Sequence, residues 1–354
     1  MGLQRAVDAL SLRPVEGIPS FEVLEHPGIV KKLSGIDPYE DPINACIKAL
    51  PLLEIDWVQD IPRTVVSFAE GQSTITVGDG SKLTEWGFSG SPWEEDYGFN
   101  SAEEVLAYRP LEDREGRVRV VGRAYREARI RGPRESRKLV GDAALISGLY
   151  YTTLFQFGIM AFGWENFLTA AALDPKTFGI ILDQFADISV ENVSEWVQDD
   201  CPVFFFHDDL AITRGLVFAP EWYRREIFPR YERILEPAHK AGKIVVFVSD
   251  GRFEELIPDL IALGINGIHV DNSNDLQSIL ERYGEDHAVI GSVDTQILTR
   301  GSCEEIGEEV KRLAETGKRY PGFFFKSGGD LPHNIPMANI EAYIRFKREF
   351  GRRA

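Results

Sequence analysis

Short apolar runs recur through the C-terminal half of the chain and predict buried strands. Polar and apolar residues do not alternate within these runs, which indicates strands covered on both faces, as in a parallel sheet. The runs lie at residues 202–206, 244–248, 267–270, 288–290 and 322–325.

Amphipathic segments separate the runs. Residues 220–240, 253–263 and 304–316 each place apolar side chains three or four positions apart, which predicts helices that bury one stripe. Strands that alternate with helices through short connections are typical of parallel α/β folds. Because no GxGxxG motif follows any of the runs, we expect a (β/α)8 TIM barrel rather than a dinucleotide-binding sheet.

The N-terminal half is less regular. Residues 175–197 predict a long helix, and residues 152–171 are expected to hold a barrel loop and a helix. Residues 64–88 predict a hairpin, with its turn at Gly78-Asp79-Gly80.

The segment between the hairpin and the long helix is rich in polar residues. Residues 85–133 predict loops, and the charged run at residues 112–137 is typical of a solvated surface. We therefore expect one domain over residues 1–354, with an N-terminal extension and hairpin at about residues 1–140.

Composition and charge narrow the class of protein. Hydrophobic residues make up 44% of the chain and charged residues 27%, and the net charge is -17. This charge argues against nucleic acid as a partner, because phosphate binding needs a surplus of Lys and Arg. Cys46, Cys201 and Cys303 are far apart and odd in number, which fits a reducing compartment. With no membrane-length apolar run and no signal-like N-terminus, we expect a cytoplasmic protein without a membrane partner.

Polar side chains follow each of the five predicted strands. In a barrel, functional side chains gather at the carboxyl ends of the strands. Several carboxylates around one pocket cannot all ionise freely, so some share a proton or enclose a cation. That cation could be a metal, Lys326, Arg214, Arg252 or a charged ligand. The candidate site residues are His207, Asp208, Asp209, Asp250, Asp271, Asp294, Gln296 and Lys326.

Each candidate also has a structural interpretation. Asp208 or Asp209 could cap the next helix, Asp250 suits a turn, and Asp271 suits a helix N-cap. His207 could be a histidine that only holds the fold together. The candidates together are stronger evidence for a functional site than any one of them, because every one of these structural explanations would have to be correct at the same time.

A metal site is one possibility at the strand ends. Zinc binds His and carboxylate side chains, and His207, Asp208 and His269 could supply nitrogen and oxygen ligands from neighbouring strands. The chain has no HExxH motif, so metal-assisted chemistry rests on these residues alone. It also has no GxSxG motif, and no Ser-His-Asp arrangement stands out.

Four segments together resemble the uroporphyrinogen decarboxylase superfamily. They begin with FEVLEHPG at residue 21, DDLAITRG at residue 208, YGEDHAVIG at residue 283 and PMANIEAYI at residue 336. The resemblance implies an (α/β)8 barrel with a single deep cleft. True haem-pathway decarboxylases carry an Arg-Gln-Ala-Gly-Arg motif and a Gly-His-Gly motif. This chain has GIPSFEVL and Gly328-Gly329-Asp330 instead, which puts haem synthesis in doubt.

The sequence also resembles the corrinoid-dependent methyltransferase branch of that superfamily. Some members bind zinc through His-x-Cys and a later Cys, and the matching positions here are Val248-Ser249-Asp250 and Gly329. The acidic pair Asp208-Asp209 matches the branch. The resemblance therefore implies a methyltransferase that demethylates a small methyl donor, such as an aromatic methyl ether, and passes the methyl group to a corrinoid on a partner protein.

An ether oxygen is a poor leaving group, so this chemistry needs an acid or a Lewis acid. We expect His207, Asp208 and Asp250 to fill that role, with zinc as a possible cofactor. The expected substrate-binding residues are Asp209, Arg214, Asp271, Asp294, Gln296 and Lys326. Two alternatives stay open: a decarboxylase or other lyase acting on an anionic substrate, and a ligand-binding protein without catalysis. Residues Trp86–Phe99 could form a lid or a homodimer interface.

Overall fold

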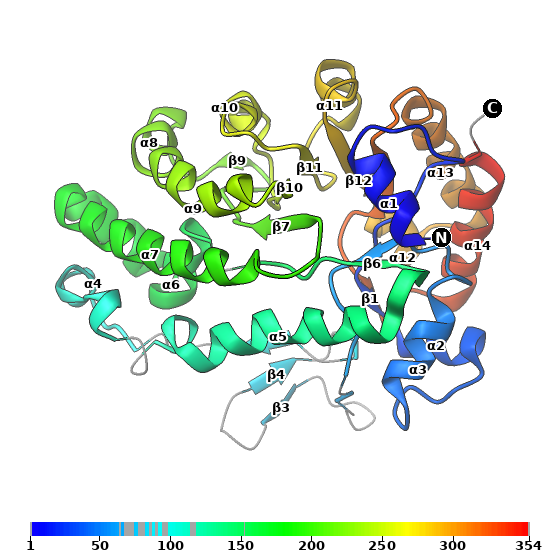
Figure 1. The fold of residues 1–354 in the computed structure, drawn as a ribbon, viewed down its shortest axis with the longest axis horizontal. Coiled ribbons are helices and arrows are strands. Elements are labelled where there is room, and N and C mark those ends of the chain that lie inside the picture. Colours follow the sequence, from blue (N-terminus) through cyan, green and yellow to red (C-terminus); the bar gives the residue numbers. More distant parts are fainter. Residues whose placement is uncertain are drawn as a thin grey trace. The chain divides into compact units, whose positions relative to one another are not determined.

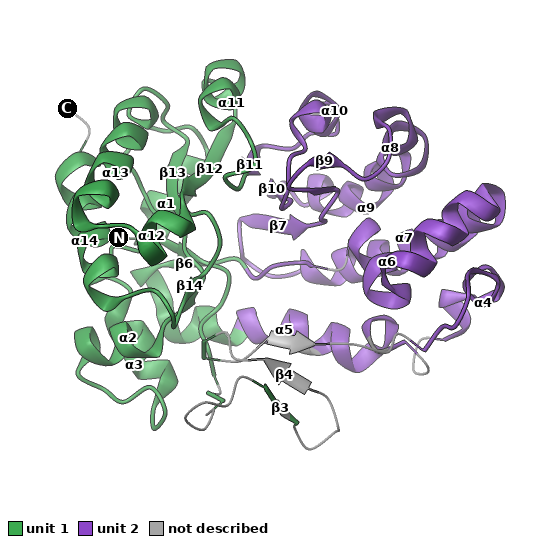
Figure 2. Ribbon diagram, turned by 180° about the vertical axis from the view of Figure 1, so that it is seen from behind, with its two compact units in different colours: residues 1–94, 135–147, 270–354 green, residues 95–134, 148–269 purple. Residues whose placement is uncertain are grey.

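The computed structural model describes residues 2–63, 65–66, 74–76, 82–84, 87–88, 91–93, 98–113, 118–151 and 153–352. The chain forms two compact units, each built from separate stretches of sequence (Figure 2). Unit 1 consists of residues 1–94, 135–147 and 270–354, and unit 2 consists of residues 95–134 and 148–269. The helix α5 (Arg123–Val140) begins in unit 2 and ends in unit 1.

Parallel strands form the centre of unit 2. Strand β10 (Ile244–Val248) lies between β7 (Val203–His207) and β11 (Gly267–His269). In this register Val248 pairs with both His207 and His269. Aromatic side chains fill the core beside these strands, because the run PVFFF supplies Phe204 and Phe206, which are fully buried.

Helices of unit 2 follow the strands in sequence (Figure 1). The helix α7 (Pro175–Trp196) packs against α6 (Phe155–Leu173) and α9 (Phe228–Lys240), and Asp174 caps the N-terminus of α7. A short antiparallel hairpin, β8 (Ala211–Ile212) with β9 (Gly215–Leu216), follows β7. The helical segments of this unit are α4 (Ala102–Ala107), η1 (Pro110–Glu112), η2 (Arg119–Val121), α6 (Phe155–Leu173), α7 (Pro175–Trp196), α8 (Pro220–Glu226), α9 (Phe228–Lys240), η4 (Glu254–Leu256) and α10 (Ile257–Ala262).

Unit 1 contains parallel strands from both ends of the chain. Strand β12 pairs with β13, the segment around Ser20 bridges to β13, and β1 pairs with β14. Phe21 bridges to β2, which pairs with β6. The strands are β1 (Leu24–Glu25), β2 (Trp57–Val58), β6 (Leu145–Ile146), β12 (Ala288–Val293), β13 (Phe323–Ser327) and β14 (Leu331–Pro332).

The remaining elements of unit 1 are helices and an antiparallel set of three short strands. A capping box at Ser302 and Glu305 fixes the start of α13, which packs against α14. The helices are α1 (Gly2–Leu10), α2 (Pro27–Ser34), α3 (Pro42–Ala49), η3 (Gly141–Ala143), α11 (Leu276–Tyr283), α12 (Thr295–Arg300), α13 (Cys303–Gly317) and α14 (Met337–Phe350). The antiparallel strands are β3 (Thr74–Thr76), β4 (Lys82–Thr84) and β5 (Ser91–Trp93).

The α/β fold class of a (β/α)8 barrel is confirmed, as are the five strands of the C-terminal half, with shifts of a few residues at their ends. The long helix predicted at residues 175–197 is α7. The helix predicted at residues 220–240 is divided into α8 and α9 at Ile227, two residues before Pro229. Within the described residues, no helix combines the length and the apolar character needed to cross a membrane.

The N-terminal half also contributes strands, because the segment at residues 20–25 and β2 pair in parallel with other strands of unit 1. One expectation for this half was wrong. Residues 85–133 are not all loop, because they hold α4 and the start of α5. The predicted hairpin corresponds to β3 and β4, while its turn at Gly78-Asp79-Gly80 lies outside the described residues.

Candidate functional site

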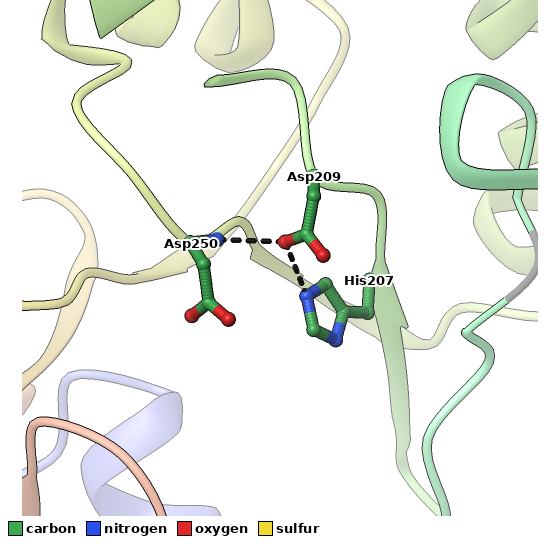
Figure 3. A group of neighbouring side chains, drawn as sticks. All are labelled: His207, Asp209 and Asp250. Carbon is green, nitrogen blue, oxygen red and sulfur yellow. Dashed lines mark hydrogen bonds and ion pairs between the residues drawn. The ribbon is translucent and has the colours of Figure 1, made fainter. Parts of the chain in front are cut away.

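Three polar side chains meet where β7 and β10 end in unit 2 (Figure 3). His207 is the last residue of β7, Asp209 lies two residues further along the chain, and Asp250 lies two residues after the end of β10. The Nε2 atom of His207 lies 2.6 Å from Oδ1 of Asp209. One nitrogen or oxygen ligand atom from each of the three lies within 4.8 Å of the others. We call these three residues the His207 cluster.

Backbone contacts between the two strand ends fix the His207 cluster. The backbone N–H of Asp250 donates to Oδ1 of Asp209 over 2.8 Å, and the backbone N–H of Leu210 donates to the Ser249 hydroxyl over 3.0 Å. Gly251 has a φ of +79°, and a Cβ there would lie 2.7 Å from backbone carbons of the β8–β9 hairpin. Only glycine fits this close approach, so the loop after β10 can lie directly against the loop after β7.

Asp208 has a different role from its neighbour. Its fully buried carboxylate accepts hydrogen bonds from the backbone N–H groups of Leu154, Phe155 and Gln156, over 3.1, 2.8 and 2.5 Å. The hydroxyl of Tyr231 is a fourth donor, at 2.5 Å. The carboxylate therefore satisfies the free N–H groups at the start of α6.

We predicted Asp208 as an acid and a metal ligand, and the structure does not bring it into the His207 cluster. Burial raises the pKa of Asp208 to about 6, although hydrogen bonds from Tyr231, Gln156 and Phe155 oppose that rise. At neutral pH the carboxylate is thus mainly ionised, with its oxygens taken up by the start of α6. Asp209, which we expected to bind substrate, occupies the place beside His207 instead.

His207 and Asp209 form an ion pair in a nearly dry setting. Burial lowers the pKa of His207, but the Asp209 carboxylate outweighs this effect, helped by Asp250 and Asp208, and the pKa lies above its ordinary value of 6.5. Burial raises the pKa of Asp209, and the charge and hydrogen bond of His207 outweigh it, so that pKa is lowered. The favoured state is an imidazolium held by a carboxylate, which is suited to donating a proton.

Tyr151 completes the surroundings of the pair and was not predicted. Its ring meets the His207 ring edge to face, with centroids 4.4 Å apart, and its hydroxyl donates to Oδ2 of Asp209 over 3.4 Å. Burial and the nearby carboxylates raise the pKa of Tyr151, so its hydroxyl stays protonated. Recognising that Tyr150 pairs with Phe206 would have shown Tyr151 to follow a strand end.

The other predicted residues of unit 2 lie outside the His207 cluster. His269 is buried at the end of β11 and is not one of the three grouped residues. Arg214 is exposed between β8 and β9, and its carbonyl accepts a hydrogen bond from Arg252 over 2.9 Å.

The predicted residues of unit 1 make local contacts. The carboxylate of Asp271 accepts from the Ser273 backbone over 2.8 Å, and Asp294 caps α12 by accepting from the Gln296 backbone over 2.7 Å. The buried Lys326 ammonium donates to the carbonyls of Ser327 and Gly329. The N-cap interpretation of Asp271 was wrong, because Asp275 caps the next helix, α11.

The His207 cluster could hold a divalent cation. One imidazole nitrogen and two carboxylates are a donor set that zinc accepts, and a fourth position would remain for substrate or water. This set differs from the predicted one, since Asp209 and Asp250 take the places expected for Asp208 and His269. Asp250 is the exposed member, so an ion could enter from its side.

The comparisons with known proteins agree with the resemblance seen in the sequence. The family described as Uroporphyrinogen decarboxylase (URO-D) matches residues 87–350. The chain is 20% identical over 178 residues to the uroporphyrinogen decarboxylase of Pelobacter propionicus, and 23% identical over 177 residues to that of Geobacillus kaustophilus. These matches cover 50% of this chain and 51% and 49% of the two relatives, so the chain spans about half the length of the curated relatives it matches.

A solved structure extends the likeness to the whole chain. The methyltransferase from Methanosarcina mazei has a TM-score of 0.64 and 16% sequence identity, and the match covers 99% of this chain and 98% of that one. An identity this low shows the fold and leaves the activity open. By its fold and by the family match over residues 87–350, the chain belongs to the uroporphyrinogen decarboxylase family.

Proposed function

We propose that this protein is a methyltransferase that takes a methyl group from a small methyl donor, such as an aromatic methyl ether, and passes it to a corrinoid on a partner protein. The observation that supports this proposal is the ion pair between His207 and Asp209, 2.6 Å apart and beside Asp250. Cleavage of an ether leaves an alkoxide or a phenoxide unless the oxygen receives a proton. A buried imidazolium is a group that can supply one.

The residues of the His207 cluster divide this task. His207 donates its proton to the ether oxygen as the bond between methyl carbon and oxygen breaks. Asp209 holds the imidazole ring and stabilises its charge, and the Asp250 backbone N–H fixes the carboxylate. The corrinoid supplies the nucleophile that accepts the methyl group. As an alternative to this proton, a zinc-type cation held by neutral His207, Asp209 and Asp250 would polarise the oxygen as a Lewis acid.

A lyase acting on an anionic substrate is the second candidate, since the curated relatives are uroporphyrinogen decarboxylases. Such a reaction needs cations that face the substrate carboxylate. Arg214 and Arg252 are the arginines near the β8–β9 hairpin, and the Lys326 ammonium already donates to two carbonyls. Failure of the wild-type protein to release carbon dioxide from any of a panel of anionic carboxylate substrates would remove this candidate.

The direct test mixes the purified protein with cob(I)alamin and a panel of methyl ethers, and follows methylcobalamin by its absorbance. We expect the wild-type protein to form methylcobalamin with at least one ether. The Asp209→Ala variant should form it at least about a hundredfold more slowly, which is the usual range for loss of acid catalysis. Glu315→Ala, which changes an exposed carboxylate, is the matched control. No methylcobalamin from any ether would overturn the proposal.

A further inference from the structure

A cavity in unit 1 gathers basic side chains, although the chain as a whole has a net charge of -17. Its volume is about 390 Å³, which lies in the range of small-molecule sites. Basic residues outnumber acidic ones in its lining. The charged lining residues are Arg5, Lys347, Arg348 and Arg352, together with Glu16 and Glu54. We call this space the arginine cavity.

The arginine cavity lies at the amino end of a strand segment in unit 1. Ser20, which is part of its lining, begins the segment at residues 20–25 and bridges in parallel to Phe325 of β13. The carboxyl end of that segment is β1. In a barrel the reacting substrate binds at the carboxyl ends of the strands. A ligand of the arginine cavity would therefore be an effector and not the substrate.

Two of the four cations are held in place by the fold. The Arg5 guanidinium donates to both carboxylate oxygens of Asp56, over 2.9 and 2.5 Å. The buried ammonium of Lys347 donates to the Ser20 hydroxyl over 2.8 Å. These contacts fix two positive charges beside the cavity, whether or not a ligand is bound.

The other two cations keep hydrogen-bond donors in reserve. Arg348 donates from Nε to Glu54 over 2.7 Å and from Nη2 to the Leu52 carbonyl over 2.9 Å, which leaves its Nη1 group without a partner among the described residues. The Arg352 side chain makes no hydrogen bond or ion pair in the part of the chain that the structure describes. Positive charges around one space repel one another, and an anion between them removes that repulsion.

We propose that the arginine cavity binds a small anion that carries a phosphate group, with Arg348 and Arg352 as the residues that contact it. The cations come from three places: Arg5 from α1, Lys347 and Arg348 from α14, and Arg352 from the residues after α14. A tetrahedral phosphate accepts hydrogen bonds from several directions, and guanidinium groups match its oxygens in pairs. A planar carboxylate offers fewer directions.

This site is independent of the proposed methyl transfer, and its ligand has a separate effect. A phosphate held in the arginine cavity would connect α1 to the end of α14. Because a ligand that binds only the folded state stabilises it, phosphate should raise the melting temperature of the protein.

Calorimetric titration of the whole protein with inorganic phosphate tests the proposal, at constant ionic strength and without corrinoid or methyl donor. Succinate, a dicarboxylate, is titrated in parallel to distinguish phosphate from carboxylate recognition. We expect one phosphate site that binds phosphate more tightly than succinate. The affinity for phosphate should fall roughly tenfold or more in Arg352→Gln and in Arg348→Gln, as for loss of a charged hydrogen bond.

Two further variants show whether the effect belongs to this cavity. Arg345→Gln changes an exposed arginine on α14 that lines a neighbouring cavity, and Arg312→Gln changes an exposed arginine on α13. Both should bind phosphate within about twofold of the wild type, because charges outside the cavity are largely screened.

Thermal unfolding gives a second measurement of the same site. Phosphate should raise the melting temperature of the wild type more than chloride does at equal ionic strength, and this difference should be lost in Arg352→Gln. Absence of phosphate binding by the wild type would overturn the proposal. Tighter binding of succinate than of phosphate, or equal weakening in Arg345→Gln and Arg352→Gln, would overturn it as well.

Discussion

Asp208 and Asp209 are neighbours in the sequence but have different roles in the structure. Asp208 points to the start of α6 and accepts three backbone N–H groups, while Asp209 points to His207 and Asp250. Their side chains have the same chemistry, so the difference lies only in what surrounds each one. The Asp208 carboxylate already accepts four hydrogen bonds, so it is poorly suited to proton transfer. The Asp209 carboxylate remains available for proton transfer.

Replacing Asp208 should therefore lower stability. In Asp208→Asn the amide group cannot satisfy all three N–H groups of α6, so we expect the free energy of unfolding to fall by about 2–3 kcal/mol. Asp209→Asn should lower it less than Asp208→Asn does, because the Asp209 carboxylate accepts one backbone N–H where that of Asp208 accepts three. Urea unfolding followed by circular dichroism measures both. An equal loss in the two variants would contradict the assigned roles.

Metal binding at the His207 cluster has its own test. Titration of the metal-free protein with zinc should give one site, and His207→Ala or Asp250→Asn should weaken it roughly tenfold or more through loss of a ligand. Asp208→Asn should leave the zinc affinity nearly unchanged. If Asp208→Asn abolished zinc binding, the ligand set predicted from the sequence, which contains Asp208, would be right. The His207 cluster would then be wrong as the metal site.

At the scale of elements, α6 contains a break that the sequence pattern does little to indicate. Gly163, inside the helix, has a φ of 73° and a ψ of 163°, a backbone region almost restricted to glycine. The start of this helix holds Asp208 in place, so the break lies in an element that supports the candidate site.

We expect Gly163→Ala to reduce the free energy of unfolding by about 1–3 kcal/mol, because alanine is strained in this conformation. Gly179→Ala in α7 is the matched control, since its backbone is helical and a new Cβ would lie 3.4 Å from the Arg230 side chain. Thermal or urea unfolding would record the difference. A smaller loss in Gly163→Ala than in Gly179→Ala would mean that the helix passes Gly163 without a break.

The elements also show where sequence reasoning succeeds and where it stops. Strands such as β7 and β10 were predictable because continuous apolar runs are sufficient evidence for buried strands. Strands β1, β2 and β6 are two residues long, and they exist because distant partners pair with them. No local pattern could have identified them, nor the position of Tyr151 after one such pairing. The strand ends were predictable, but the direction of each side chain was not.

At the scale of the whole molecule, the ends of the chain meet in unit 1 through a buried lysine. Lys347 of α14 donates to the Ser20 hydroxyl over 2.8 Å and to the Leu53 carbonyl over 3.4 Å. Burial lowers its pKa, and this outweighs the opposite effect of the carboxylates of Glu22, Glu54 and Asp56, while Arg5 lowers the pKa further.

This shift predicts a dependence of stability on pH. Between the lowered pKa of folded Lys347 and the ordinary value of 10.5, the folded state binds fewer protons than the unfolded state, so the free energy of unfolding rises with pH. We expect this rise, at most about 1.4 kcal/mol per pH unit, to disappear in Lys347→Met. Urea unfolding at several alkaline pH values compares the two proteins. Identical slopes would contradict a lowered pKa.

The central claim is that the His207–Asp209 pair activates a methyl donor, and one rate tests it most directly. The rate of methylcobalamin formation from cob(I)alamin and a methyl ether should be measured for the wild type, Asp209→Ala and Asp208→Asn, below the temperature at which any of them unfolds. We predict that Asp209→Ala loses at least about a hundredfold, whereas folded Asp208→Asn stays within about tenfold of the wild type. Full activity in Asp209→Ala, or none in the wild type, would contradict the account.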